Sequence, residues 1–87
     1  MSEDTKKLQW ACRRGMLELD VMLQPFLNDK YSALDAEHQA IFRRLLDCQD
    51  QDLFEWLTDK KIIEDDVELA EMVDMVRHYS EHRERYF

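Results

Sequence analysis

Apolar side chains recur along this chain at the three- and four-residue spacing of α-helices, and they do not alternate with polar ones over strand-length stretches. The single glycine also leaves no room for glycine-rich hairpin turns. We therefore expect an all-α fold, a compact bundle of about five short helices. The apolar stripes are Leu8, Ala11 and Cys12; Met16, Leu19, Leu23, Phe26 and Leu27; Ile41, Phe42, Leu45 and Leu46, with Cys48 a further candidate; Leu53, Phe54, Trp56 and Leu57; and Leu69, Met72, Val73 and Val76.

Breaking residues divide the first two stripes. Gly15 follows Arg13 and Arg14, and this order predicts a helix end with cations in its last turn and a glycine in a left-handed cap. Pro25 lies inside the second stripe, where it removes one backbone N–H and crowds the preceding turn. We expect the second helix to kink there.

Capping residues predict where the later helices begin. Ser32 or Asp35 can cap the third helix, and Asp50 is the expected cap of the short fourth helix. Asp65 and Glu68 have the spacing of a capping box, in which each side chain bonds the other's backbone N–H. The fifth helix is therefore predicted to start beside Asp65.

The length of 87 residues predicts a single helical domain over 1–87, with loose ends at 1–5 and 80–87. A chain of this size buries only about 60–65% of the surface that its unfolded form exposes. It has no room for a dinucleotide-binding domain or a deep substrate cavity, and a single glycine excludes a glycine-rich phosphate loop. We therefore expect a protein that is not an enzyme.

Charge is uneven along the chain. Residues 1–14 hold four basic and two acidic residues, a net charge of +2, whereas the rest holds eight basic and eighteen acidic residues, a net charge of −10. Nucleic-acid binding depends on a basic surface that releases counterions, so this acidic body argues against a nucleic-acid partner. The acidic excess is typical of a well-solvated surface, and a monomer is the default expectation.

Cysteine usage and hydropathy indicate the compartment. Cys12 and Cys48 lie far apart without further cysteines, which favours reduced thiols packed as small core residues and a cytoplasmic protein. No apolar run approaches the ~20 residues of a membrane-spanning helix. The first residues are too polar for a secretory signal, so we expect no membrane insertion.

Other candidate sites have simpler structural explanations. His78 and His82 have the spacing of two zinc ligands on one helix, but there is no HExxH motif and no third ligand is evident, so a solvated face is favoured. Cys12 stands near two arginines but at a helix C-terminus, which disfavours its thiolate. Met residues at helical spacing are typical core filler, and no Ser/His/Asp set can be assembled.

The segment 10–20 concentrates glycine, arginine and acidic residues, and two interpretations of it are compatible. In the structural one, Gly15 ends a helix and the neighbouring charges match the helix dipoles. In the functional one, Gly15 lets another backbone come close, Arg14 offers a planar donor, and Glu18 offers an acceptor. The residues alone therefore indicate a protein-interaction module.

This segment resembles the signature of the succinate dehydrogenase flavinylation factors, the bacterial counterparts of mitochondrial succinate dehydrogenase assembly factor 2. The family's mark is Arg-Gly-x-x-Glu, which stands here as Arg14 to Glu18. The resemblance covers roughly residues 9–76. The supporting matches are Trp10-Ala11-Cys12-Arg13, Leu19-Asp20, Pro25-Phe26, Ile41-Phe42-x-Arg44-Leu45-Leu46 and Asp52-Leu53-Phe54-x-Trp56-Leu57.

The resemblance implies a small chaperone that binds the flavoprotein subunit of succinate dehydrogenase, and by extension that of fumarate reductase. It would promote covalent attachment of FAD to a histidine of that subunit, hold no FAD stably itself, and not be an enzyme. Gly15 would be the point of close approach, and Arg14 and Glu18 the polar anchors, with Arg13 and Asp20 secondary.

Two other functions stay open at this point. Similar proteins are also described as antitoxins that neutralise a small membrane-associated toxin. Such a protein would relieve the toxic effect whatever the flavin content of the cell. An unrelated acidic adaptor that merely shares the segment 10–20 is the third possibility.

Overall fold

The five apolar stripes form five helices. The protein is described here by a computed structural model that covers residues 3–82, and within that range the chain contains no strand. The helices are α1 (Glu3–Ala11), α2 (Leu17–Lys30), α3 (Ala36–Leu46), α4 (Asp50–Leu57) and α5 (Val67–His82), with a short 3₁₀ turn, η1 (Tyr31–Ala33), after α2. The predicted all-α fold is therefore confirmed.

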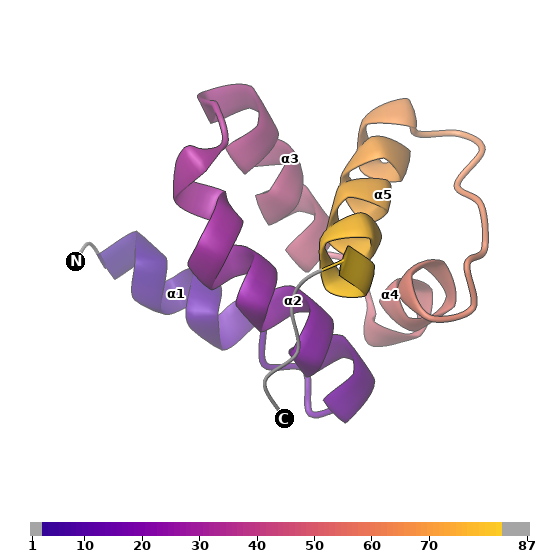
Figure 1. Cartoon of the computed structure of the whole chain (residues 1–87), viewed down its shortest axis with the longest axis horizontal. Helices are drawn as coiled ribbons and strands as arrows, with labels where there is room; N and C mark the ends of the chain where they lie inside the picture. The colour runs from indigo at the N-terminus through magenta and orange to yellow at the C-terminus, as the bar shows by residue number, and fades with distance from the viewer. Residues whose placement is uncertain (1–2, 83–87) are drawn as a thin grey trace.

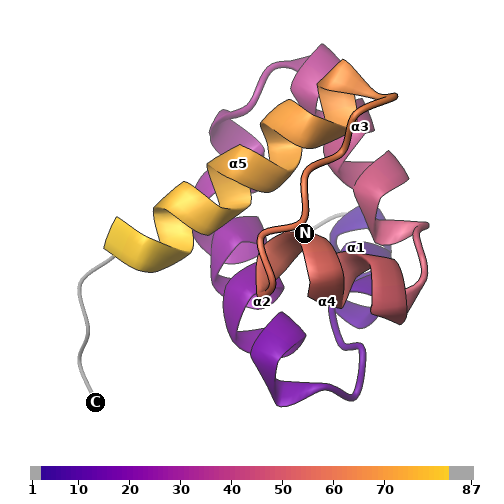
Figure 2. The same cartoon turned by 90° about the vertical axis from the view of Figure 1, so that its right-hand side faces the viewer.

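Helix α5 is the element around which the others gather. It packs against α3, α2 and α4, while α1 packs against α2 at the other side of the molecule (Figure 1). Figure 2 shows α5 crossing in front of the remaining helices, with the connector from α4 running up to its first turn. The described helices form one compact body of 35 × 33 × 23 Å.

One hydrophobic core joins all five helices. Phe26 of α2 and Phe42 of α3 lie at its centre, with their ring centroids 5.3 Å apart. Cys48, Phe54 and Trp56, which the stripes also placed inward, are only half-buried. The buried apolar residues are Leu8, Cys12, Leu19, Leu23, Phe26, Leu27, Ile41, Phe42, Leu45, Leu46, Leu53, Leu57, Met72, Val73 and Val76.

Acidic side chains start two of the helices, one of them as predicted. The Oδ1 atom of Asp35 accepts a hydrogen bond from the backbone N–H of His38 at 2.8 Å, so Asp35 caps α3. The predicted capping box at Asp65 is wrong by one residue. Asp66 accepts the hydrogen bond from the N–H of Leu69 at 3.1 Å, because α5 begins at Val67.

The prediction for α4 is wrong in the same way. Gln49 is the residue that precedes this helix, and it makes no side-chain capping bond, whereas Asp50 is the first helical residue. The carboxylate of Asp50 is engaged by an arginine far away in the sequence. That long-range bond explains why a local capping rule misassigned it.

The boundary between α1 and α2 also differs from the prediction. Gly15 has a φ of 81°, in the left-handed region that glycine favours, but α1 already ends at Ala11. Gly15 therefore lies in the connection to α2 and is not the residue that directly terminates α1. Helix α2 continues through Pro25, and the kink expected there stays a prediction.

The two ends of the chain are only partly described. Residues 3–5 belong to α1 and residues 80–82 belong to α5, and the other residues predicted to be loose lie outside the described residues. Between residues 3 and 82, no helix is both long enough and apolar enough to cross a membrane.

Candidate partner-binding corner

The five predicted site residues lie together where α1 passes into α2, and we call Arg13, Arg14, Gly15, Glu18 and Asp20 the corner. The structure divides them by exposure. Arg13, Gly15 and Glu18 are exposed, Asp20 is half-buried, and the side chain of Arg14 keeps only 14% of its surface accessible. The corner thus has an outward side and an inward residue.

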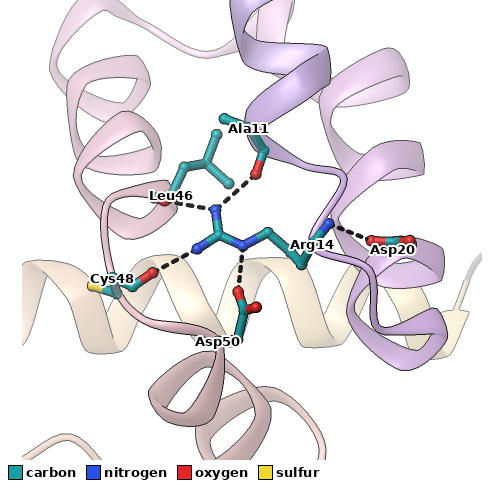
Figure 3. Close-up of polar contacts among 6 residues, drawn as sticks. All are labelled: Ala11, Arg14, Asp20, Leu46, Cys48 and Asp50. Carbon is teal, nitrogen blue, oxygen red and sulfur yellow. Dashed lines mark hydrogen bonds and ion pairs between the residues drawn. The ribbon is translucent and has the colours of Figure 1, made fainter.

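The guanidinium of Arg14 points into the protein and makes four hydrogen bonds (Figure 3). Its Nε–H donates to Oδ1 of Asp50 at 2.7 Å, forming an ion pair. Its Nη1 group donates to the carbonyl oxygens of Ala11 and Leu46 at 2.7 and 2.8 Å. Its Nη2 group donates to the carbonyl oxygen of Cys48 at 2.6 Å.

These acceptors explain why an arginine suits this position. Ala11 and Leu46 are the last residues of α1 and α3, and the carbonyls at a helix end have no partner within the helix. A cation there also matches the negative end of the helix dipole. Asp50 is in the first turn of α4, where an acid is favoured, so one guanidinium ties three helix ends together.

The backbone of Arg14 is fixed as well. Its N–H donates to Oδ1 of Asp20 at 2.8 Å, and Asp20 lies in the first turn of α2 (Figure 3). Arg14 therefore connects the ends of four helices. Its predicted role as an outward anchor stays a prediction, because in this conformation its guanidinium is engaged within the chain.

Gly15 is the open point of the corner. A Cβ atom built on Gly15 would meet no heavy atom within 4 Å beyond its chain neighbours, so the surface above the residue is free. Any residue with a side chain would still adopt the left-handed conformation at a cost of about 1–2 kcal/mol. The position thus combines a backbone reason for glycine with room for another molecule.

Exposed apolar side chains that do not belong to the predicted apolar stripes lie beside the corner in the sequence. Trp10 and Leu17 are each 73% exposed, and Val21 is 50% exposed. The guanidinium carbon of Arg13 lies 5.8 Å from the centroid of the Trp10 ring, a cation–π contact. Leu17 and Val21 fall off the buried stripe of α2, and that mismatch was the sequence signal for an exposed apolar surface.

Cys12, directly before the corner, is a core residue. Its side chain is fully buried, and this burial raises the pKa of the thiol to about 12, with the Arg14 guanidinium lowering it only in part. The prediction of Cys12 as a packed core residue is confirmed, and the raised pKa disfavours the reactive thiolate. Cys48 is half-buried, and burial raises the pKa of its thiol too.

The two histidines of α5 lie away from the corner. The rings of His78 and His82 stack with centroids 4.1 Å apart, and Nδ1 of His82 lies 2.9 Å from the carbonyl oxygen of His78. Among the side chains that the structure describes, no three or more His, Cys, Asp or Glu residues gather as a metal site would require.

Comparison with known proteins agrees with the corner's signature. A family model described as "Flavinator of succinate dehydrogenase" matches residues 6–80. A protein of Pseudomonas aeruginosa named FAD assembly factor SdhE is 51% identical over 78 residues, covering 87% of this chain and 92% of its own. The protein of the same name from Idiomarina loihiensis is 52% identical over 71 residues, covering 82% of this chain and 78% of its own. The chain therefore belongs to the family of flavinators of succinate dehydrogenase.

Proposed function

We propose that this protein is an FAD assembly factor that binds the flavoprotein subunit of succinate dehydrogenase and promotes covalent attachment of FAD to it. Family membership supports the assembly role, and the geometry of the corner supports the manner of binding. The single observation that supports this manner of binding most strongly is the free space above Gly15. Gly15 lies on a connection that Arg14 holds from inside the protein.

The outward side of the corner supplies the contacts in this proposal. Gly15 lets the partner's backbone approach, and the exposed carboxylate of Glu18 accepts from a partner's arginine or backbone N–H. Arg13 contributes a cation beside the Trp10 ring. Arg14 and Asp20 hold the connection in shape, so that the outward groups keep a fixed spacing before the partner arrives.

The chain carries out no bond-forming step of its own in this proposal. It binds one arrangement of the immature flavoprotein better than the others, and thereby raises the population in which flavin and histidine are held ready to react. The flavin belongs to the partner, and the related flavoprotein of fumarate reductase is a second proposed client. In this proposed function, the protein acts as a cytoplasmic monomer.

The test compares two substitutions at Gly15. Gly15→Ala and Gly15→Arg both force an L-residue into the left-handed region, so each is expected to lower the free energy of unfolding by about 1–2 kcal/mol. They differ in bulk above the surface. In a host that lacks its own factor, covalent flavin on the flavoprotein subunit is measured by fluorescence on a denaturing gel.

The native chain is expected to restore the flavin fluorescence, Gly15→Ala to retain most of it, and Gly15→Arg to abolish it while circular dichroism stays helical. Equal loss of flavin fluorescence in both variants would mean that backbone strain, and not docking, explains why position 15 requires glycine. Failure of the folded native chain to restore fluorescence, with the flavoprotein present at equal level, would overturn the proposed function.

A further inference from the structure

A groove separates α1 from α2 on the side of the molecule next to the corner. It has a volume of about 470 Å³, and its walls come from α1, from α2 and from Arg13 in the connection between them. Leu27, which is almost fully buried, contributes to it. The lining residues are Lys6, Gln9, Trp10 and Arg13 on one side and Gln24, Leu27 and Asn28 on the other.

The charge of this groove is opposite to that of the molecule. Two of its lining residues, Lys6 and Arg13, are cations, and none is an acid. The whole chain carries a net charge of −8, with twenty acidic residues against twelve basic ones. The groove is therefore a basic site on an acidic protein, and it attracts a partner of negative charge.

The groove continues into the outward side of the corner. Arg13 belongs to both, and Trp10 beside it is 73% exposed. Along α2, the exposed Leu17 and Val21 share a helical stripe with Gln24 of the groove wall. The groove and the corner therefore share Arg13, and the exposed stripe of α2 leads from Leu17 to the groove wall at Gln24.

We propose that this groove binds an extended, acidic segment of the flavoprotein subunit while the corner contacts the body of that subunit. The assignment rests on the proposed function and adds a second contact to it. Lys6 and Arg13 pair with carboxylates of the segment, and Trp10 covers its apolar part. The amides of Gln9, Gln24 and Asn28 can each donate to and accept from peptide groups of an extended chain.

A polypeptide fits these walls better than a nucleotide does. None of the seven lining residues lies in the first turn of α2, where free backbone N–H groups would bind phosphate, and only Lys6 among them lies in the first turn of α1. The groove thus offers a phosphate chiefly its two cationic side chains. Side-chain amides on opposite walls suit a chain of peptide groups.

Two neighbouring lysines on α1 provide the test and its matched control. Lys6 and Lys7 are both exposed, but only Lys6 lines the groove. Lys6→Glu and Lys7→Glu therefore make the same change in net charge on the same helix. Binding of the full-length variants to the immobilised flavoprotein subunit is measured by biolayer interferometry at low and physiological salt.

Lys6→Glu is expected to raise Kd about tenfold at low salt, with a smaller effect at high salt, because it places like charges in contact. Lys7→Glu is expected to stay within about twofold of the native Kd, since a change in net charge alone has a weak effect. Equal effects of the two substitutions, whether both large or both absent, would overturn the groove assignment.

Two further arms separate the possible failures. If Gly15→Arg abolishes binding while Lys6→Glu leaves it unchanged, the proposed function stands and the groove assignment falls. If the native chain does not bind the subunit at all, both fall. The alternative occupant is a nucleotide, and ADP at millimolar concentration serves as the competitor. If ADP displaces the subunit from the native chain but not from Lys6→Glu, the assignment to a polypeptide is overturned.

Discussion

Arg14 and Gly15 are neighbours in the sequence with opposite surroundings. The guanidinium of Arg14 lies inside the protein with four hydrogen bonds to three helix ends and the loop after α3. Gly15 lies on the surface with open space above it. Three residues later, Glu18 is exposed as well. The Arg-Gly-x-x-Glu signature is therefore one motif with an inward residue and an exposed side.

The difference shows how a small protein keeps a surface connection in shape. An 87-residue chain has little core to spare for support, so a single arginine connects the loop to α3 and α4. In the proposed function, the exposed Gly15 and Glu18 are the groups that meet the partner. We expect substitutions of the inward residue to act mainly on stability and those of the outward residues mainly on partner binding.

Arg14→Ala is expected to have the largest effect on stability. It removes the ion pair with Asp50 and leaves three backbone carbonyls without their donor, which should lower the free energy of unfolding by about 3 kcal/mol. Arg13→Ala is the matched control, because Arg13 is exposed and its guanidinium lies beside the Trp10 ring at the surface. Urea denaturation should find its stability within about 0.5 kcal/mol of the native value. Similar losses in the two variants would refute the division of the motif.

The buried thiol of Cys12 reports on the same inner region through pH. Its folded-state pKa of about 12 lies above the ordinary value of 9.0, so burial favours the protonated form. The contribution of the protonated thiol to the free energy of unfolding is therefore fully present below about pH 9. It is lost as the pH rises towards the folded-state pKa, because the unfolded chain releases the proton first. The extra loss approaches about 1.4 kcal/mol per pH unit.

The comparison variant is Cys12→Ala, which removes the thiol. Its free energy of unfolding should decline less steeply above about pH 9 than that of the native chain, although a smaller side chain lowers its stability at neutral pH. Parallel alkaline slopes in the two proteins would show that Cys12 is not held protonated next to Arg14.

Asp50→Asn tests the acid that pairs with Arg14 and should have a smaller effect. The amide oxygen can still accept from Nε–H, and the Asp50 side chain is 44% exposed, so the expected loss of stability is about 0.5–1 kcal/mol. Asp52→Asn removes the same charge from the same helical turn, and Asp52 is exposed. Thermal unfolding should give Asp50→Asn a lower Tm than Asp52→Asn. The reverse order would contradict the ion pair between Asp50 and Arg14.

The sequence predicts the helices well because their signals are local. The stripes of α2, α3 and α5 are set by neighbours three and four residues apart, and the residues at their centres are buried as expected. Asp35 caps α3 by a bond to a residue three positions away, which a local rule can also find.

Local rules could not predict that the Arg14 side chain points inward and bonds distant helix ends. Its acceptors Leu46, Cys48 and Asp50 lie 32, 34 and 36 residues away, and only the folded arrangement brings them together. Asp65 and Asp66 are adjacent acids that satisfy nearly the same capping pattern, so the register of α5 depends on its packing. The residues of segment 10–20 already indicated a protein-interaction site, and the resemblance to a family added its partner, whereas its division into inward and outward sides required the structure.

The most direct test of that division is a paired measurement on Glu18→Gln, with Glu37→Gln as its control. Both glutamates are exposed in the first turn of a helix, so each substitution should change the free energy of unfolding by at most about 0.5 kcal/mol. We expect the partner subunit to lose most of its covalent flavin fluorescence with Glu18→Gln and to retain it with Glu37→Gln. Equal flavin fluorescence in the two variants would contradict an outward, partner-binding function for the corner.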